Sequence, residues 1–333
     1  MPAVADGSQS RERYAKSSNQ AAHNKASLQP PSPARLPVSI LPNHPAGGQI
    51  WAKSHGTDRT RTVRLGSVWH ANIGCGRNAL SKGLIVSIAA EGSRFRADLA
   101  RSVRLLRAFR TEQEDTARYY TLLADDTVGQ LGQYTSLRGS LVLDVGGGPG
   151  FFVNALRAAG ARAFCVDADA GELAGRGTTE PGSVLGSALD LPVRSGQVDV
   201  SFSSNVLEHV PDPHRMLAEM IRVTRPGGVV FCAFTNWLSP WGGHETSPWH
   251  YLGGERAAQR YQRRYGKPPK NRYGNGLYPV SVVQALRWAR SSRDAQLLDA
   301  VPRYLPGWSR PLLRVPGARE VLTWNLLVVL KRR

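Results

Sequence analysis

Short runs of apolar residues alternate with longer stretches of helical periodicity between residue 141 and the end of the chain. Runs bounded by Gly, Pro or polar residues are typical of buried strands, whereas apolar positions three or four residues apart indicate helices. The expected strands cover residues 141–145, 163–167, 183–185, 198–203, 229–234, 295–301 and 321–330, and the expected helices cover 151–159, 213–224 and 282–289. This alternation favours a parallel, doubly wound sheet with helices on both faces.

The ends of several elements carry their own signals. Ser281 is the expected N-cap of the helix at 282–289, and Arg225-Pro226-Gly227-Gly228 ends the helix at 213–224,. The linker between the last two expected strands is too short for a full crossover helix, so we expect these strands to pair antiparallel. The α/β fold is therefore predicted as a seven-stranded sheet with an antiparallel last strand.

Two further helices are expected before the first strand. Five apolar residues recur at intervals of four, four, three and three residues, which places them on one helical face: Phe95, Leu99, Val103, Leu106 and Phe109,. A second helix is expected at 116–130. Arginines are distributed around the rest of the first helix, namely Arg96, Arg101, Arg104, Arg107 and Arg110. Either they grip a phosphate or lipid headgroup, or they form a solvated helix face, which is the more frequent case.

Residues 1–90 show neither helical nor strand periodicity and contain the breaker cluster Pro30-Pro31-Ser32-Pro33,. They hold 11 Lys and Arg against 3 Asp and Glu, which is +8 of the total net charge of +18. One interpretation is a basic tail for nucleic acid or an anionic membrane surface. We favour a disordered extension, or a start codon assigned too far upstream, because the interleaved aromatic residues of a nucleic-acid groove are missing.

The domain organisation follows from these patterns. We expect a disordered basic extension at 1–90, N-terminal helices at 91–135 and one α/β domain at 136–333. An insertion at 239–280, rich in Trp, Tyr, Pro, Gly and Arg, interrupts this domain and is expected to fold over the sheet edge. Hydrophobic residues make up 41% of the chain, which is enough for a core of this size,.

Composition also excludes several classes of protein. Cys75, Cys165 and Cys232 are too few and too far apart for a disulfide framework or a cysteine-paired zinc site,. No apolar run reaches the ~18 residues that a membrane-spanning helix needs. The N-terminus carries no apolar stretch that would make a signal peptide. These observations favour a cytoplasmic protein.

The sharpest local motif is the turn after the first expected strand, Asp144-Val145-Gly146-Gly147-Gly148-Pro149-Gly150. Glycines there let a ligand approach the backbone at the carboxyl end of the sheet. The spacing of Gly146, Gly148 and Gly150 is G-x-G-x-G, whereas the dinucleotide fingerprint is G-x-G-x-x-G. Asp144 would repel a pyrophosphate on the adjoining helix N-terminus. A cofactor with a cationic centre and no phosphate fits this turn better.

This turn resembles that of the class I S-adenosylmethionine-dependent methyltransferases, and further motifs follow in the family's order. Asp167 ends the second strand 21 residues after Gly146. The adenine-side motif, the fourth strand with its loop and the turn before the fifth strand are matched by residues 185–192, 198–210 and 226–228. The resemblance covers about residues 95–333 and implies a Rossmann-like fold with S-adenosyl-L-methionine as cofactor.

The last third of the chain resembles a narrower group. Three short segments are similar to actinobacterial methyltransferases that have no assigned substrate: Asn236-Trp237, Gly243-His244-Glu245 and Thr323-Trp324-Asn325-Leu326. This resemblance implies a methyltransferase but names no acceptor.

The family resemblance implies a set of cofactor-binding residues. They are Asp144, Gly146, Gly148, Gly150, Asp167, Ser187, Ala188, Asp190 and Asn205. Asp167 matches the family's acidic residue on the ribose hydroxyls, a role that suits a carboxylate with two acceptor oxygens. Ser187 stands where the family usually has an acidic residue, so the adenine contact passes to Ser187, Asp190 or the backbone. A purely structural role of Asp144 and Asp167 is disfavoured by their joint spacing to the glycines.

Two histidines are candidate catalytic residues. His209 is either a general base that accepts a substrate proton or a ring that only shapes the pocket. His244 lies near Glu245 and His250 in the insertion, where a substrate-loop role competes with plain loop structure. A metal site at these three residues is disfavoured, because their spacing is not H-E-x-x-H and no third ligand is obvious. We therefore expect no metal.

The absence of certain motifs narrows the range of possible methyl acceptors. Amino-directed nucleic-acid methyltransferases carry an Asn/Asp-Pro-Pro-Tyr/Phe tetrad where this chain has Ser204-Asn205-Val206-Leu207, and no cysteine follows a proline as in pyrimidine C5 enzymes. The loop at 207–213 resembles that of enzymes acting on small molecules, quinones, sugars or lipids. We expect methyl transfer to a small-molecule or lipid-like acceptor at oxygen, with nucleic acid disfavoured as a partner and peripheral contact with a membrane surface left open.

Two alternatives of other classes stay open. A basic protein on a methyltransferase-like scaffold that binds or modifies nucleic acid would show steeply salt-dependent binding. A non-catalytic relative would bind cofactor without turning it over. The aromatic insertion, with Trp237, Trp241 and Trp249, either lines an apolar acceptor pocket or lies against lipid.

Overall fold

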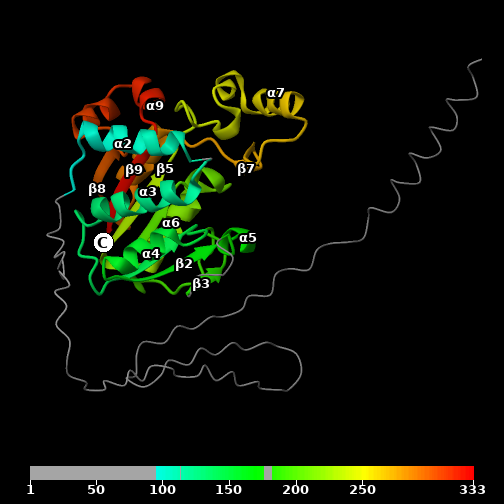
Figure 1. Ribbon diagram of the computed structural model, residues 1–333. Helices are drawn as coiled ribbons and strands as arrows, with labels where there is room; N and C mark the ends of the chain where they lie inside the picture. The colour runs from blue at the N-terminus through cyan, green and yellow to red at the C-terminus, as the bar shows by residue number, and fades with distance from the viewer. Residues whose placement is uncertain (1–94, 113, 176–181) are drawn as a thin grey trace, which may run out of the picture. The chain divides into compact units, whose positions relative to one another are not determined.

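The computed structural model describes residues 95–112, 114–175 and 182–333 (Figure 1). The expectation of a disordered extension at 1–90 lies outside this part of the chain. A sheet of seven strands forms the centre, in the order β3-β2-β1-β4-β5-β9-β8. Its strands are β1 (Leu141–Val145), β2 (Arg162–Asp167), β3 (Ser183–Leu185), β4 (Val198–Ser204), β5 (Thr224–Phe234), β8 (Ala295–Pro302) and β9 (Leu326–Arg332).

The strand directions confirm the predicted topology. β3, β2, β1, β4 and β5 pair in parallel. β9 is antiparallel to both β5 and β8. The carboxyl ends of the five parallel strands therefore meet at one edge of the sheet, which is where ligands bind in open α/β folds.

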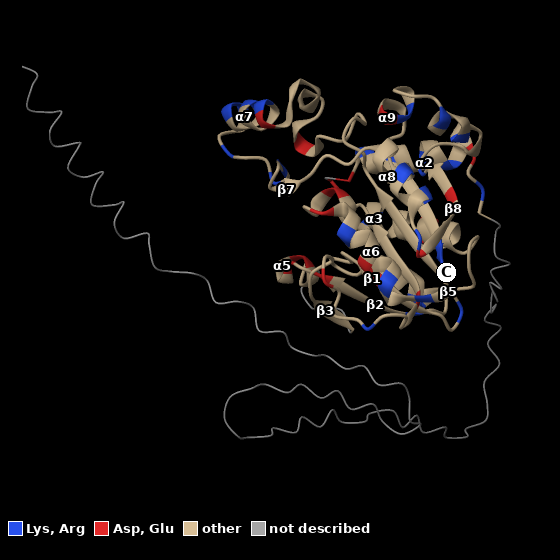
Figure 2. Cartoon of the chain, turned by 180° about the vertical axis from the view of Figure 1, so that it is seen from behind, with Lys and Arg blue, Asp and Glu red and all other residues tan. Residues whose placement is uncertain are grey.

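Helices cover both faces of the sheet (Figures 1 and 2). α2 (Leu99–Arg110), α3 (Thr116–Leu131) and α4 (Phe151–Ala158) lie on one face, and α6 (Pro213–Val223) and α8 (Val282–Ser291) on the other. The side chains of β1 pack alternately against the helices on the two faces of the sheet. Leu143 and Val145 belong to the hydrophobic cluster that contains α6 and α8, whereas Val142 belongs to the cluster with α3 and α4. Burial on both sides explains the continuous apolar runs of these strands.

The apolar face expected for the first helix is buried only in part, with Phe95, Leu106 and Phe109 half-buried. Leu99 is 61% exposed and Val103 37% exposed, whereas Arg101 is only 3% exposed. Arg101 turns inward because its guanidinium pairs with Asp126 on α3 at 2.7 Å and donates to the Arg303 carbonyl oxygen at 2.8 Å. For Arg101, neither a ligand grip nor a solvated face describes its place, because this ion pair fixes α2 to α3.

Two strand boundaries also differ from the expectation. β5 begins at Thr224, which pairs with Val198 before regular pairing resumes at Val229 opposite Val200. The last strand begins at Leu326, because residues 318–322 form α9 (Ala318–Leu322) instead. The Glu320 carboxylate accepts hydrogen bonds from the first two backbone N–H groups of α8, which holds α9 against that helix,.

The insertion at 239–280 contains several short elements. They are η2 (His244–Thr246), η3 (Trp249–Leu252), α7 (Gly254–Tyr265), β6 (Arg272–Tyr273) and β7 (Gly276–Leu277). The remaining short elements are α5 (Ala170–Leu173), η1 (Leu207–His209) and η4 (Gly307–Arg314). Among the described residues, no helix is both long and apolar enough to cross a membrane.

Candidate active site

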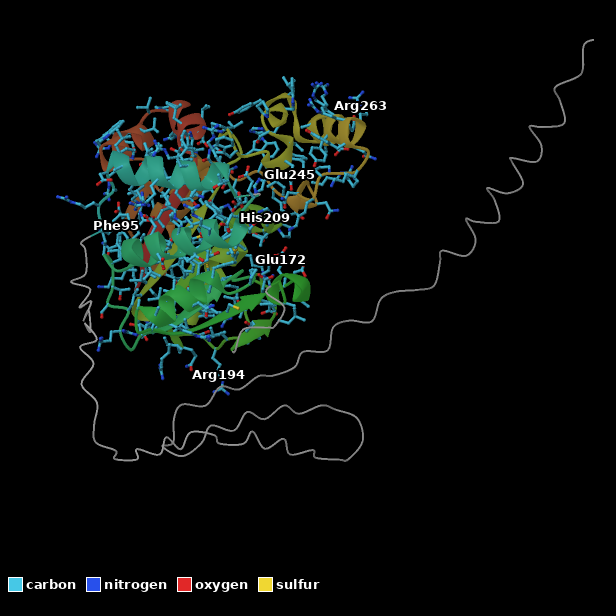
Figure 3. The ribbon with its side chains drawn as sticks, in the orientation of Figure 1. Phe95, Glu172, Arg194, His209, Glu245 and Arg263 are labelled. Carbon is cyan, nitrogen blue, oxygen red and sulfur yellow. The ribbon has the colours of Figure 1, made fainter. Side chains whose placement is uncertain are left out.

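One large cavity, of about 1270 Å³, lies at the carboxyl ends of the parallel strands. Several parts of the chain line it, and three contribute most of the residues discussed below. The first is the set of strand ends, including Gly146, Asp167 and Asn205; the second is formed by α2 and α3; the third comes from the insertion. Figure 3 shows His209 between Glu245 of the insertion and Glu172 of α5, all of which line the cavity. A site for one small ligand typically measures ~300–1,000 Å³. This cavity therefore has room for two molecules.

The glycine turn is built for close approach of a ligand. Gly146, Gly148 and Gly150 have φ values of 77°, 47° and 83°, the left-handed region that glycine adopts without strain,. A Cβ on Gly146 would overlap the Val206 side chain. Gly146 and Gly148 line the cavity, whereas Gly150 does not and instead is the N-cap residue of α4.

Two aspartates support this turn in different ways. Asp167 lines the cavity, and its Oδ2 accepts a hydrogen bond from the Gly148 backbone N–H at 2.9 Å. Asp144 does not line the cavity, because it is buried beneath the turn with 1% of its surface exposed. Burial raises the pKa of the Asp144 carboxyl to about 8, and the nearby Asp167 carboxylate adds to the shift,.

Only some of the other predicted cofactor residues line the cavity. Ser187, Ala188 and Asn205 line the cavity, whereas Asp190 is exposed and lies outside the lining. Asn205 has a φ of 58°, an uncommon conformation for a residue with a side chain,. Its Oδ1 accepts a hydrogen bond from Asn325 at 2.7 Å, which fixes its amide at the end of β4.

Both predicted catalytic histidines line the cavity, and they lie close together. The ring centroids of His209 and His244 are 4.9 Å apart, although 35 residues separate them in the sequence. Glu208 joins them, and one donor atom from each of the three side chains lies within 4.8 Å of the others. We call Glu208, His209 and His244 the Glu–His–His cluster. Glu245 lines the cavity outside this cluster, and His250 is buried within the insertion.

Hydrogen bonds hold the cluster in place. His209 Nδ1 lies 2.7 Å from the Gly276 carbonyl oxygen, which can only accept, so Nδ1 is the donor of this hydrogen bond,. The Glu208 carboxylate accepts from the Thr235 backbone N–H at 2.9 Å. His244 has a φ of 49°, a strained conformation of the kind that concentrates at functional sites,. Burial lowers the pKa of the His244 ring, against the opposing effect of the Glu208 carboxylate.

An aromatic wall forms another side of the cavity. We give this name to Phe109, Tyr119, Tyr120, Phe151, Trp241 and Trp324. Consecutive rings are in contact, with centroids 6.4 Å apart for Trp324 and Trp241 and 5.1 Å for Trp241 and Phe109. The series continues through Tyr119 and Tyr120 to Phe151. Trp237 and Trp249 of the insertion do not line the cavity.

Comparison with known proteins agrees with this geometry. Residues 143–232 match the family model described as a methyltransferase domain. An uncharacterized methyltransferase of Mycolicibacterium gilvum is 50% identical over 246 residues, which cover 71% of this chain and 96% of the relative. Another, from Mycobacteroides abscessus, is 47% identical over 251 residues, which cover 72% and 96%.

This chain belongs to the S-adenosylmethionine-dependent methyltransferases. It is also similar to a solved S-adenosylmethionine-dependent methyltransferase from Mesorhizobium loti, with 18% identity, coverage of 61% of this chain and 96% of that one, and a TM-score of 0.43. That likeness is too weak to say anything about the acceptor. The cofactor of the methyltransferase is S-adenosyl-L-methionine.

Sequence reasoning missed several residues of the methyltransferase cavity. The sequence gives no signal that sets Glu208 apart, although it is adjacent to His209 in the chain. Tyr119 and Tyr120 fall within the helix expected at 116–130, which by itself indicates no role in the cavity. Both tyrosines follow the helical spacing of α3, and only the packing of α3 against the strand ends shows that they line the site.

Proposed function

We propose that this methyltransferase moves the methyl group of S-adenosylmethionine to a hydroxyl oxygen of a small-molecule or lipid-like acceptor. One observation carries the proposal: the Glu–His–His cluster and the aromatic wall line the same cavity as the glycine turn. The wall suits an acceptor with a large apolar part, and the cluster suits an acceptor group that must lose a proton.

The cofactor occupies the side of the cavity formed by the strand ends. The glycine turn approaches the methionine part, and the Asp167 carboxylate accepts hydrogen bonds from the ribose hydroxyls. Both Asp167 oxygens already accept one backbone hydrogen bond each, from Gly148 and Asp169, and each has a second lone pair,. Ser187 and Ala188 stand at the adenine end. Asp144 acts from beneath the turn, without touching the cofactor.

The acceptor occupies the side formed by α2, α3 and the insertion. Methyl transfer is an in-line displacement, so the hydroxyl oxygen must lie within ~3–3.5 Å of the methyl carbon. A neutral hydroxyl is a weak nucleophile, and its proton must leave as the new C–O bond forms. Removing that proton is the work that we assign to the Glu–His–His cluster.

Peripheral contact with an anionic membrane surface would bring a lipid-like acceptor to the cavity. Three exposed apolar residues lie on η3, namely Trp249, Tyr251 and Leu252. Four exposed arginines lie on the adjoining α7 (Figure 2): Arg256, Arg260, Arg263 and Arg264. Apolar and basic side chains on one surface fit lipid headgroups of negative charge. Sedimentation with anionic and with neutral vesicles tests this contact, and equal recovery from both would contradict it.

A comparison of extracts tests the proposed function. Lipids and metabolites from cells with and without the protein are compared by mass spectrometry, in search of a species that is heavier by one CH₂ group. We expect such a species, and we expect the Asp167→Ala variant to lose it. A product whose methyl group lies on nitrogen or carbon would contradict the assignment to oxygen.

A further inference from the structure

We propose that the Glu–His–His cluster is an open binding site for one divalent transition-metal cation of the zinc type. The site would hold the acceptor oxygen on its free side, so this inference rests on the proposed function for its catalytic use. Two histidines and one carboxylate are a recurrent ligand set for Zn²⁺ and Fe²⁺ in sites that keep a position open for water or substrate.

The donor atoms are already gathered. One from each of Glu208, His209 and His244 lies within 4.8 Å of the other two. Ligands at ~2.0–2.2 Å from a zinc ion lie roughly 3.4 Å from one another. Side-chain rotations that move each donor atom by about an ångström would therefore bring the three around one ion. The backbone of η1 and η2, which carry these residues, would not have to move.

The hydrogen bonds of the cluster leave the required lone pairs free. His209 donates its Nδ1 proton to the Gly276 carbonyl oxygen, and His244 Nδ1 lies 3.4 Å from the Gly242 carbonyl oxygen. A backbone carbonyl on the far nitrogen of the ring is the usual support of a metal-bound histidine, because it fixes the ring and leaves the other nitrogen to the ion.

Glu208 provides a second and independent observation. Its side chain is buried, with 1% of its surface exposed, and one oxygen accepts from the Thr235 backbone N–H. The other oxygen, Oε2, is buried and has no hydrogen-bond partner within the described part of the chain. A buried carboxylate oxygen without a partner is costly, and a cation in the cluster would satisfy it.

The position of the cluster gives the ion a chemical use. All three residues line the cavity, so the unoccupied side of the ion would face the acceptor. A hydroxyl bound there releases its proton to water more readily, because the cation stabilises the oxygen anion. The oxygen lone pair then forms the C–O bond, the C–S bond breaks, and its electron pair stays on sulfur. The balance is acceptor hydroxyl plus S-adenosylmethionine to methyl ether, S-adenosylhomocysteine and one proton.

Metal binding can be tested without acceptor or cofactor. The full chain is stripped with a chelator and titrated with Zn²⁺ against a chromophoric chelator, for the wild type and for Glu208→Gln, His209→Ala and His244→Ala. His214→Ala is the matched control, because His214 is five residues from His209 but exposed on α6. Circular dichroism of each variant verifies folding.

We expect one tightly bound Zn²⁺ per chain in the wild type and in His214→Ala. Each cluster variant should weaken binding by more than the ~10–100-fold that loss of a residue supporting a metal ligand costs. Visible absorption of the Co²⁺-loaded wild type, lost in His209→Ala, gives a second readout. The proposal is overturned if the wild type binds no Zn²⁺, or if folded cluster variants bind it as tightly as His214→Ala.

The result separates this inference from the proposed function. Zn²⁺ binding at the cluster without any oxygen-methylated product would leave the metal site standing and contradict the proposed function. If chelator-stripped protein forms an oxygen-methylated product equally well, and Zn²⁺ does not bind, the proposed function would stand and the metal site would be contradicted.

Discussion

The two sides of the cavity are built from the chain in different ways. The side that we assign to the cofactor consists of residues 146–149, Asp167 and residues 187–188, and it comes from the ends of three neighbouring parallel strands. The side that we assign to the acceptor consists of Trp324 and of cavity-lining residues from α2, α3, η1 and the segment 235–276, which lie far apart in the sequence. The cofactor side depends on backbone conformation and on a few fixed spacings. The acceptor side depends on which side chains distant segments bring together.

The two sides should differ in how well they tolerate substitutions. A backbone-built site fails when one glycine gains a side chain, because the chain itself is in the way. A side-chain-built site loses affinity by steps, as each ring or ligand is removed. Substitutions on the cofactor side should therefore abolish cofactor binding, and those on the acceptor side should change acceptor turnover while cofactor affinity is kept.

The largest effect is expected at Gly146. Valine there would require a φ of 77° and would overlap Val206, so the turn cannot keep its shape. We expect the affinity for S-adenosylmethionine to fall at least ~1,000-fold in Gly146→Val, measured by calorimetry. Gly139→Ala is the control, since Gly139 has the same φ with no atom within 4 Å of an added Cβ. Equal losses of cofactor affinity in both variants would mean that backbone strain alone lowers the affinity. The turn at Gly146 would then not be a special feature of the cofactor side.

The next effect is expected at Asp167. Asp167→Ala removes the carboxylate that accepts a hydrogen bond from the Gly148 N–H and that we assign to the ribose hydroxyls. Hydrogen bonds to charged groups contribute ~1.5–3 kcal/mol each, so the cofactor affinity should fall about 100-fold. Asp190→Asn, at an exposed position outside the cavity lining, should stay within about twofold of the wild type. An affinity for Asp167→Ala that matches Asp190→Asn would remove Asp167 from the cofactor side.

A smaller effect is expected on the acceptor side at Trp241. Trp241→Ala removes the ring between Phe109 and Trp324, which opens the aromatic wall. With the acceptor found by mass comparison, kcat/KM should fall roughly 30-fold, the size of a loss of ~2 kcal/mol. The affinity for S-adenosylmethionine should not change. Trp308→Ala is the matched control, because Trp308 is exposed and lies outside the cavity lining. A lowered cofactor affinity in Trp241→Ala would mean that the two sides are not separate.

The smallest effect, expressed as the change in the unfolding constant for each pH unit, is expected for the stability of the folded protein around Asp144. Because burial raises the pKa of Asp144 from its ordinary 3.8 to about 8, the folded state holds this proton more tightly than the unfolded state. The stabilising contribution is fully present below pH ~4 and is lost as the pH rises to about 8, by up to about tenfold in the unfolding constant per pH unit.

Asp144→Asn should remove this dependence. In cofactor-free protein, the melting temperature of the wild type should fall relative to that of the variant between pH 5 and pH 8, which differential scanning calorimetry measures. If the melting temperatures of the two proteins change in parallel across this pH range, Asp144 does not hold the additional proton of the folded state.

The residues that we assign to the cofactor side could be grouped from the sequence because their signals are local. The strand at 141–145, the three glycines and Asp167 follow one another within a short stretch, and parallel pairing brings them together without further information. Gly150 and Asp190 match the family's motifs but lie outside the cavity lining, because a motif spacing does not report which way a residue faces.

The acceptor side was harder to predict, and α2 shows why. Leu99 and Val103 follow the helical spacing of a buried face, yet Arg101 is inside. The choice was decided by Asp126, a partner 25 residues further along the chain. The Glu–His–His cluster has the same character, because His244 reaches His209 only through the fold of the insertion. Long-range pairings of this kind leave no periodic pattern in the sequence.

The central claim is that the two sides meet to methylate oxygen. The most direct test supplies S-adenosylmethionine with a ¹³C-labelled methyl group to the purified full chain and a lipid extract, and reads the label by carbon NMR. For the wild type we predict a labelled methyl resonance in the methoxyl region, and for Gly146→Val we predict that this resonance is absent. A label that appears on nitrogen or carbon, or one that Gly146→Val transfers as fast as the wild type, would contradict it.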